Sequence, residues 1–317
     1  MRIVMMGTGT FAEPTLQSLL ASRHEVVGLV TNPDRPSGRE REMVRGMKAI
    51  AVEHGAPVFQ PESVNTPEGV ARVREFQADL LVVAAYGQIL SADVLNAAPM
   101  GGINVHASLL PKYRGAAPIA WAIWNGETRT GVTIIRMSTK LDAGDMLAQE
   151  ALDILPDETE GELETRLAPI GARLALATMD QIESGTARGA KQDPTLVTKA
   201  PKLKKEHGLI DWSQPAARVC CQIRAVQPWP TAYTFWHRPN QPPVRLLVTK
   251  ASATSGESLP PGTVAQVTKD SLAVASGSGW VSLLKLQPSG KRVMDAGEFL
   301  RGNRVQVGER CGGEGVE

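Results

Sequence analysis

Two polar side chains, Asn104 and His106, stand two residues apart at the end of a short apolar run. If that run is a β-strand, both side chains leave it on the same face. An imidazole titrates near neutral pH and can take a proton from a nucleophile, and an asparagine amide can donate to a developing oxyanion. A single histidine is more often structural. The pair, followed by a segment that contains glycine and proline, favours a catalytic role.

Carboxylates that could serve this pair lie in the segment from Leu141 to Asp145. One aspartate there could simply form a turn. Two aspartates, Asp142 and Asp145, could include the carboxylate that orients the imidazole. Their spacing alone does not choose between them.

A glycine pattern, Gly7-x-Gly9-x-x-Ala12, follows the first apolar run of the chain. Taken alone it is a dinucleotide-binding fingerprint, which also needs an acidic residue at the end of the second strand. Here that strand ends before Pro33, and Asp34 comes only after the proline. A tight turn from strand to helix is therefore favoured over a nucleotide site.

The elements that would position these residues alternate along the first half of the chain. Short, mostly apolar runs predict buried strands at residues 3–6, 26–31, 57–59, 79–84 and 102–105. Between them, apolar residues recur at helical spacing at residues 11–22, 43–54 and 66–76. This alternation predicts an α/β fold with a parallel sheet covered on both faces, whose ligands bind beyond the carboxyl ends of the strands.

The second half of the chain changes character twice. Two more strands are expected at residues 131–137 and 145–152, and a long helix at residues 159–184. Residues 185–207 lose periodicity and gather lysines, which predicts an extended connection. Later short β-type runs separated by turn residues predict a small sandwich or five-stranded barrel, with strands at residues 244–249, 262–267, 271–275 and 280–285. The predicted domain limits are 1–188, 189–207 for a basic linker, and 208–317.

Charge is divided unevenly between these parts. The whole chain of 317 residues carries a net charge of +1. Residues 1–190 hold 17 basic and 23 acidic side chains, a balance of −6, and residues 191–317 hold 17 and 10, a balance of +7. One basic part points to a polyanion bound on one side only. Within the acidic part, the basic stretch at residues 32–48 could be either a solvated loop or a mobile finger near the strand ends.

Composition argues against membrane and secreted classes. The chain is 42% hydrophobic and 21% charged, which is ordinary for a globular enzyme. Its longest apolar run, residues 80–85, is far too short to span a bilayer, and no leader pattern opens the chain. The three cysteines, Cys220, Cys221 and Cys311, allow no disulfide framework or four-ligand zinc spacing. We therefore expect a cytoplasmic protein.

The segment INVHASLLPKYRGAAP at residues 103–118, with GVTIIRM at 131–137 and LDAGDML at 141–147, closely resembles the methionyl-tRNA formyltransferases. The similarity covers nearly the whole chain and includes NPDRPSGR, DLLVVAAYGQIL, LVTKAPKLKKEHGLIDW, IRAVQPWPTAY and LLKLQPSGK. These segments separate this family from amino-sugar formyltransferases and from the hydrolase part of formyltetrahydrofolate dehydrogenase, which carry a similar Asn-x-His and distant aspartate.

This resemblance implies a Rossmann-like formyltransferase domain followed by a small OB-like β-barrel domain that helps to hold tRNA. It implies transfer of a formyl group from 10-formyltetrahydrofolate to the α-amine of methionyl initiator tRNA. The catalytic residues would be Asn104, His106 and Asp142, with Asp142 chosen over Asp145 by the resemblance alone. No metal is expected, and we expect a monomer.

The resemblance also assigns ligand contacts. The stretch expected to contact the folate comprises Ser108, Leu109, Leu110 and Pro111, and a strand-end loop near the same pocket contains Tyr86 and Gly87. The residues expected to contact tRNA are Arg39, Lys202, Lys204 and Lys205.

Two departures from the family pattern bear on these expectations. Gly9 stands where the family usually has proline, which creates the dinucleotide-like pattern and leaves its effect on the folate pocket open. Glu40 and Glu42 dilute the charge of the basic stretch, so Arg39 is the best candidate for a contact with the acceptor stem.

Three other functions remain as alternatives. A nicotinamide-dependent dehydrogenase would bind NAD or NADP through Gly7, Gly9 and Ala12, but the strand-end acid is missing. A non-catalytic RNA-binding protein would use only the basic half, against which the Asn–His–Asp set argues. A formyltransferase acting on an amino-sugar nucleotide is disfavoured by the basic second domain.

Overall fold

The computed structural model describes residues 1–34 and 39–315, and of residues 39–45 only the helical backbone. The chain folds into two compact units. Unit 1 comprises Met1–Ile119, Arg129–Asp153 and Glu162–Lys202, and unit 2 comprises Ala120–Thr128, Ile154–Gly161 and Leu203–Glu317. Because these units interleave along the chain, they do not map simply onto the predicted limits 1–188, 189–207 and 208–317, which stay predictions.

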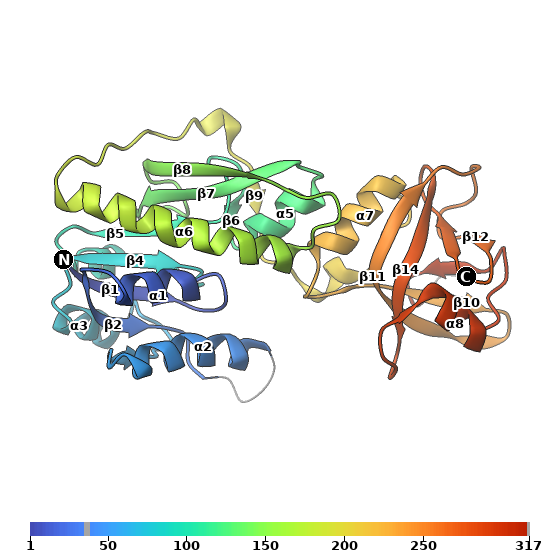
Figure 1. Cartoon of the computed structure of the whole chain (residues 1–317), viewed down its shortest axis with the longest axis horizontal. Helices are drawn as coiled ribbons and strands as arrows, with labels where there is room; N and C mark the ends of the chain where they lie inside the picture. The colour runs from blue at the N-terminus through green and yellow to red at the C-terminus, as the bar shows by residue number, and fades with distance from the viewer. Residues whose placement is uncertain (35–38, 316–317) are drawn as a thin grey trace. The chain divides into compact units, whose positions relative to one another are not determined.

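Unit 1 is built on a seven-stranded sheet in the order β3-β2-β1-β4-β5-β7-β8 (Figure 1). Its strands are β1 (Arg2–Gly7), β2 (Glu25–Val30), β3 (Val58–Phe59), β4 (Leu80–Ala84), β5 (Gly102–His106), β7 (Arg129–Arg136) and β8 (Met146–Asp153). The first five strands in this order are parallel, and β7 and β8 are antiparallel to their neighbours. The predicted Rossmann-like α/β fold is therefore confirmed, with an antiparallel edge.

Helices cover both faces of this sheet. They are α1 (Glu13–Leu20), α2 (Arg39–Glu53), α3 (Pro67–Glu75), α4 (Ala92–Leu95) and α6 (Glu160–Glu183). Helices α1 and α6 lie on one face in Figure 1, where Gly171 of α6 packs closely against Val105 and Val132. On the other face, Phe76 after α3 packs against Gly28 of β2. Because both faces are covered, β4 is apolar and buried at every position.

The glycine pattern near the start of the chain is explained by close packing. A Cβ atom on Gly7 would lie 2.8 Å from the carbonyl oxygen of Ala84 and 2.9 Å from the Cβ of Ala12. Gly9 has φ +89°, and its carbonyl accepts from the backbone N–H of Ala12 at 3.0 Å. These glycines make the tight strand-to-helix turn that the sequence favoured.

Short connecting elements complete the first unit. A two-stranded sheet pairs β6 (Arg114–Gly115) in parallel with β9 (Lys199–Ala200), and the 3₁₀ turn η1 (Pro194–Leu196) precedes β9. The short helix α5 (Pro118–Trp124) follows β6, and its residues from Ala120 onward belong to unit 2. Among the described helices, none is both long and apolar enough to cross a membrane.

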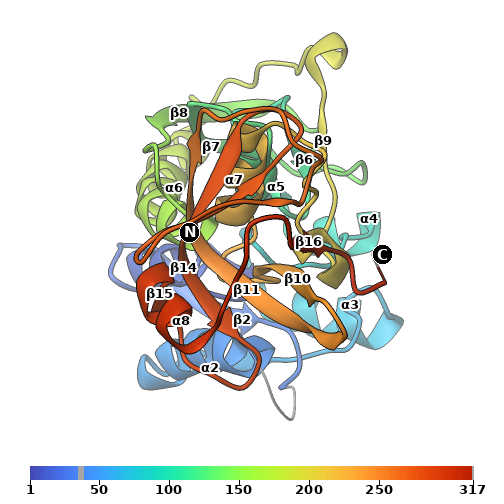
Figure 2. The same cartoon turned by 90° about the vertical axis from the view of Figure 1, so that its right-hand side faces the viewer.

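Unit 2 is a strongly curled antiparallel sheet in the order β12-β13-β14-β11-β10-β16, with β15 paired to β14 (Figure 2). Its strands are β10 (Ala232–Arg238), β11 (Gln241–Thr254), β12 (Val264–Val267), β13 (Leu272–Ala275), β14 (Trp280–Pro288), β15 (Met294–Asp295) and β16 (Arg310–Gly312). Its helical elements are η2 (Lys205–Gly208), α7 (Ala216–Ala225) and α8 (Ala296–Gly302).

Main-chain hydrogen bonds join the two edge strands of this sheet. The N–H of Cys311 donates to Gly262, and the N–H of Val264 donates to Glu309. The curled sheet encloses a core that includes Trp236, Val281 and Phe299. This architecture confirms the predicted OB-like barrel domain, but the sheet has seven strands where the sequence predicted five.

Candidate active site

Asn104 and His106 lie on the same face of β5, as the strand period requires. They pair with Ile135 and Thr133 of β7, respectively. His106 is 5% exposed, whereas Asn104 is half-buried. The asparagine is therefore the more accessible member of this pair.

Asp142 completes the set from the loop between β7 and β8. Its Oδ1 accepts from Asn104 Nδ2 at 3.4 Å, and its Oδ2 lies 3.7 Å from His106 Nδ1. The backbone N–H of Gly115 donates to Oδ2 at 2.8 Å, which fixes the carboxylate most tightly. Asp145 is exposed at the end of the same loop, so the geometry brings Asp142 to the pair.

Both ring nitrogens of His106 face hydrogen-bond acceptors. Nε2 lies 2.9 Å from the carbonyl oxygen of Tyr113 and therefore carries a hydrogen, because a carbonyl can only accept. Nδ1 faces the Asp142 carboxylate across 3.7 Å. The carbonyl of Tyr113 and the carboxylate of Asp142 thus flank the ring and define its orientation.

The predicted folate loop, Ser108 to Pro111, is held against β7 by one hydroxyl. Thr133 Oγ1 donates to the carbonyl of Ser108 at 2.6 Å and accepts from the N–H of Leu110 at 3.1 Å. Gln149 Nε2 donates to the same hydroxyl at 2.9 Å and to the carbonyl of Leu110 at 3.0 Å. The loop is therefore fixed through its main chain.

Side chains of this loop divide into buried and accessible ones. Ser108 is fully buried and its hydroxyl donates to the carbonyl of Lys112, and Leu110 is 3% exposed. Leu109 and Pro111 are half-buried. The apolar surface that this loop can offer to a ligand therefore comes from Leu109 and Pro111.

The other predicted pocket residues follow the carboxyl end of β4. Gly87 is exposed with φ +81°, and Ala85 has φ +46°. Tyr86 is buried, and its hydroxyl has no hydrogen-bond partner among the described residues. Burial raises the pKa of the Tyr86 phenol, which therefore stays neutral. The main chain turns tightly at this edge, and the Asn32 amide donates to the carbonyl of Tyr86 at 3.3 Å.

Sequence reasoning missed the residues that hold the two catalytic segments together. Gln192 contacts the Asp142 loop, and Thr198 binds the segment after Pro111. The hydroxyl of Thr198 accepts from the N–H of Tyr113 at 2.8 Å, and its carbonyl oxygen accepts from the N–H of Arg114 at 2.9 Å. Both residues lie in the predicted linker, where the sequence shows no local periodicity. Contacts across 50 or more positions leave no short-range signal in a single sequence.

The predicted tRNA-contacting residues are only partly described. Arg39 begins α2, and its side chain lies outside the described part of the structure. Lys202, Lys204 and Lys205 are exposed, and Lys204 lies 3.5 Å from Glu206. These three lysines stand within four positions of the chain.

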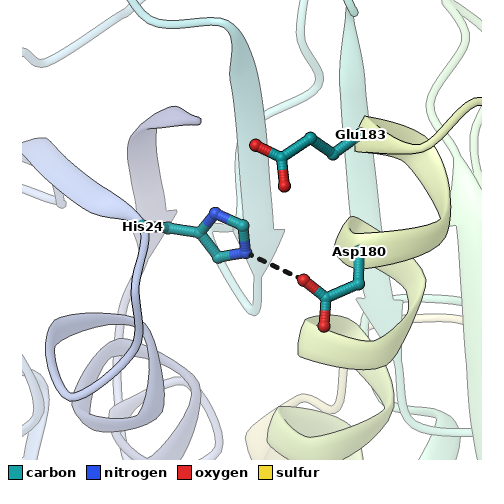
Figure 3. A group of neighbouring side chains, drawn as sticks. All are labelled: His24, Asp180 and Glu183. Carbon is teal, nitrogen blue, oxygen red and sulfur yellow. Dashed lines mark ion pairs between the residues drawn. The ribbon is translucent and has the colours of Figure 1, made fainter.

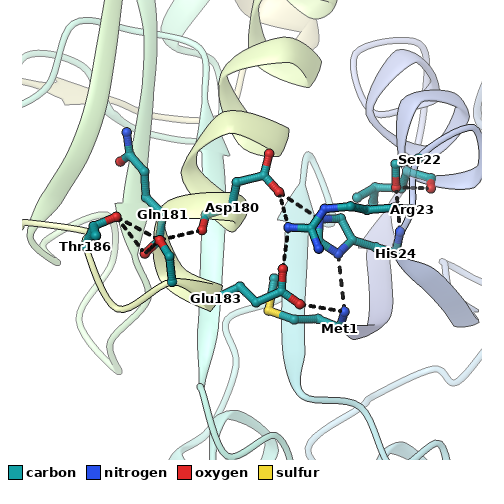
Figure 4. Close-up of polar contacts among 10 residues, drawn as sticks. Met1, Ser22, Arg23, His24, Asp180, Gln181, Glu183 and Thr186 are labelled. Atoms are coloured by element: carbon teal, nitrogen blue, oxygen red, sulfur yellow. Dashed lines mark hydrogen bonds and ion pairs between the residues drawn. The ribbon is translucent and has the colours of Figure 1, made fainter.

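A separate polar cluster joins the end of α6 to the residues before β2 (Figure 3). His24, Asp180 and Glu183 place possible ligand atoms within 4.8 Å of one another. Figure 4 shows why they also form an ion-pair network: Arg23 contacts both carboxylates, and the α-ammonium of Met1 lies 3.2 Å from Glu183. Two cations thus balance two anions around a buried histidine.

A cavity of about 370 Å³ lies elsewhere in unit 1, beside Gly102 and Arg136. It lies at the amino end of β5, whereas His106 ends that strand. We assign the active site by the convergence of Asn104, His106 and Asp142 rather than by this cavity.

Comparisons with known proteins agree over the whole length. The formyl transferase family model matches residues 1–178, and the model of the formyl transferase C-terminal domain matches residues 202–304. A methionyl-tRNA formyltransferase of Geobacter sulfurreducens is 43% identical over 316 residues, covering 99% of this chain and 98% of that protein. One from Symbiobacterium thermophilum is 45% identical over 314 residues, covering 98% and 95%.

Solved structures share the fold at much lower identity. The sugar 3N-formyltransferase WlaRD, solved with dTDP and 5-N-formyl-THF, has a TM-score of 0.65 at 16% identity and covers 92% of this chain and 99% of its own. HypX from Aquifex aeolicus, solved with tetrahydrofolic acid, has a TM-score of 0.59 at 17% identity, covering 97% and 50%. Given the full-length identity to the curated relatives, the chain belongs to the methionyl-tRNA formyltransferase family.

Proposed function

We propose that this chain transfers a formyl group from 10-formyltetrahydrofolate to the α-amine of methionyl initiator tRNA, with Asn104, His106 and Asp142 as its catalytic centre. The observation that carries the assignment is the convergence of these three side chains, since Asp142 comes from a loop that follows His106 by 36 positions. Family membership supplies the substrates.

Each side chain has a distinct part in this chemistry. Attack of the amine on the formyl carbon develops negative charge on the formyl oxygen, which Asn104 can stabilise with its accessible amide. His106 moves the proton that the attacking amine loses to the leaving N10 of the folate, when Nε2 exchanges its bond to Tyr113 for one to the reacting group, so the intermediate collapses to the formylated amine and tetrahydrofolate. Asp142, fixed by Gly115, keeps the ring oriented and balances its charge.

The loop geometry fits a folate. Leu109 and Pro111 offer apolar contacts, and the exposed Gly87 lies in the turn that follows β4. Ser108 and Leu110 belong to the same proposed contact set. Ser108 is fully buried, and its hydroxyl, N–H and carbonyl are bonded to Lys112, His106 and Thr133, so its part in that set is to shape the loop. Folate binding is thus proposed at the carboxyl edge of β4 and β5.

The tRNA side is proposed for the basic part. Lys204 and Lys205 lie at the start of η2. This turn is anchored in unit 2 by His207: the imidazole ring lies edge-on to Trp121 at a centroid distance of 5.6 Å, and its Nδ1 accepts from the N–H of Lys204. Lys202 and Arg39 complete the proposed tRNA contacts. An anchored turn presents ammonium groups to phosphates at a lower entropic cost than a free loop does.

We also propose a cytoplasmic monomer that needs no metal for this reaction. Light scattering coupled to size-exclusion chromatography tests the monomer directly, and a dimer at micromolar concentration would contradict it. If the reaction needs no metal, turnover should be unchanged after exhaustive treatment of the protein with a chelator.

The alternative is that this chain acts on an amino sugar. Sugar formyltransferases share its fold but are only distantly similar to it in sequence. Sugar formyltransferases resemble this chain at 16% identity, whereas the curated methionyl-tRNA formyltransferases are 43–45% identical over nearly the whole chain. The balance of +7 in residues 191–317 also favours a polyanionic acceptor.

A formyl-transfer assay with variants tests this proposal. We expect wild-type protein to formylate methionyl initiator tRNA, and we expect His106→Ala, Asn104→Ala and Asp142→Asn each to lower kcat by about 100-fold or more. His54→Ala is the matched control, because His54 is exposed just after α2. Near-normal turnover by a folded trio variant would remove that residue from the catalytic centre, and transfer only to an amino sugar would refute the tRNA substrate.

A further inference from the structure

We propose that Gln192 is a positioning residue that holds the Asp142 loop in its catalytic conformation. Its side-chain Nε2 donates to the carbonyl of Asp142 at 2.8 Å and to that of Gly144 at 2.8 Å. Its Oε1 accepts from Arg114 Nε at 3.0 Å and from Arg114 Nη2 at 2.7 Å. The proposal rests on the proposed role of Asp142.

The amide of Gln192 uses its full hydrogen-bonding capacity in these contacts. A primary amide has two N–H donors and two acceptor lone pairs, and all four are engaged here. The reverse orientation would set the oxygen against two carbonyl oxygens and the nitrogen against a guanidinium. Gln192 is half-buried, while its neighbours Lys191 and Asp193 are exposed. Its side chain therefore points into the loop in one defined way.

The Asp142 loop needs such external support. Asp142 has φ +47°, a left-handed conformation that is sparsely populated by residues other than glycine. At Gly144 a Cβ would lie 1.6 Å from the carbonyl oxygen of Arg136, so the loop passes tightly over the end of β7. Strained conformations of this kind persist when surrounding contacts determine them. The two bonds from Gln192 cap the main chain on both sides of Ala143.

Gln192 also closes a ring of contacts around the carboxylate. Through Oε1 it fixes the guanidinium of Arg114, and the next residue, Gly115, donates its N–H to Asp142 Oδ2. The main-chain carbonyl of Asp142 is thus held by Gln192, and its carboxylate is held by Gly115, which follows the arginine that Gln192 binds. The glutamine sets the distance between the two loops that meet at the catalytic carboxylate.

Steady-state kinetics of Gln192→Glu tests this role. The replacement keeps the size of the side chain and an acceptor for Arg114, but it sets a carboxylate against two carbonyl oxygens. We expect kcat to fall about 10- to 100-fold, the cost of small misplacement at a reacting centre, while KM for the formyl donor and for the tRNA changes by less than about twofold. Gln192→Met keeps the length of the side chain and removes all four hydrogen bonds. It should likewise lower kcat with little change in KM, and it replaces the glutamate variant if that variant does not fold.

A double-mutant cycle separates positioning from a general structural effect. If Gln192 acts through Asp142, adding Gln192→Glu to Asp142→Asn lowers kcat no further. Asp193→Ala is the control: Asp193 caps η1 by accepting from the N–H of Thr195 at 2.8 Å, so this variant loosens the same segment without touching the amide. We expect its kcat to stay within about twofold of the wild-type value.

The possible failures are distinguishable. Full activity of folded Gln192 variants, losses that multiply in the double mutant, or an equal loss in Asp193→Ala would each overturn the positioning role while leaving the catalytic centre intact. Full activity of Asp142→Asn would instead overturn the role of Asp142 in the proposed function, and the positioning role with it.

Discussion

At the scale of single residues, one buried hydroxyl connects the catalytic strand pair to the proposed folate loop. Thr133 stands opposite His106 and bonds to the main chain on both sides of Leu109. Its side chain is fully buried and is bonded to main chain and to Gln149. The shape of the loop therefore depends on a residue that does no chemistry itself.

Thr133→Val should weaken binding of the formyl donor more than it slows the chemical step. Loss of the hydroxyl leaves the N–H of Leu110 and the amide of Gln149 without their acceptor, which costs about 1–3 kcal/mol of stability. We expect KM for the formyl donor to rise about tenfold, as the loop relaxes, with a smaller change in kcat. Initial rates at varied donor concentration and urea unfolding measure the two effects.

A matched variant elsewhere in unit 1 controls for the buried hydroxyl itself. Thr178 in α6 is also buried, and its hydroxyl donates to the carbonyl of Leu174 at 2.8 Å. Thr178→Val should leave the donor KM unchanged. If both variants raised KM equally, the effect would belong to general loosening of the unit and not to the folate loop.

At the scale of elements, the sequence allowed the first unit to be predicted better than the second. Strand β4 is apolar at every position because both its faces are buried, so a short apolar run identified it. Strand β10 was not predicted as a strand: of its three inward residues, Ala232 and Thr234 are small or polar and Trp236 alone is large and apolar, while the half-buried Tyr233 and Phe235 face outward. Helix α7 was missed in the same region. Where apolar size does not follow burial, the pattern that predicts a strand disappears.

The site itself was predicted as far as local patterns reach. Asn104 and His106 share a face because they are two apart on one strand, which any strand guarantees. Asp142 was chosen over Asp145 only through resemblance, because nothing local shows that the loop turns back to β5. The part of the predicted linker before residue 201 pairs with β6 and holds the Asp142 loop, and these long-range contacts depend on the whole fold.

The network at the end of α6 predicts how acid affects stability. Hydrogen bonds from Arg23 hold the pKa of Asp180 below its usual value, and the terminal ammonium, with Arg23, does the same for Glu183. Burial, with the nearby cations, lowers the pKa of His24. A lowered carboxyl pKa means that the folded state binds fewer protons, so each carboxylate stabilises above its unfolded pKa and that stability is lost as pH falls.

Arg23→Gln should therefore make stability less sensitive to acid. The variant is expected to be less stable than wild type at pH 7, and the difference in free energy of unfolding should shrink as pH falls below about 4, near the unfolded pKa of an aspartate. Urea unfolding at pH 7 and at pH 3–4 measures the difference. Arg173→Gln removes one exposed pair, with Glu150, from the same helix and is the control. An equal dependence on pH in both variants would contradict the assignment to this cluster.

At the scale of the whole molecule, the two units divide the work that we propose for a formyltransferase acting on tRNA. The proposed chemistry belongs to unit 1, which contains Asn104, His106 and Asp142. Unit 2 carries an anchored turn with Lys204 and Lys205 at its start. The net charge of +1 for the whole chain therefore conceals a balance of +7 in residues 191–317, which include these lysines.

This division predicts which constants depend on salt. Each phosphate neutralised by a lysine releases counterions, so tRNA affinity should fall steeply as salt rises. Replacing Lys204 and Lys205 by alanine should make the slope of log K against log salt shallower by about one for each phosphate that is no longer neutralised. The variant should raise KM for tRNA and leave KM for the formyl donor unchanged, because the lysines lie outside unit 1.

A second pair of lysines provides the control for this salt dependence. The exposed Lys269 and Lys291, replaced together, remove the same charge from elsewhere in unit 2. If that pair changed the slope equally, tRNA binding would respond to the charge of the unit and not to the η2 turn. A wild-type affinity that did not depend on salt would remove electrostatics from recognition altogether, because phosphate contacts cannot form without releasing counterions.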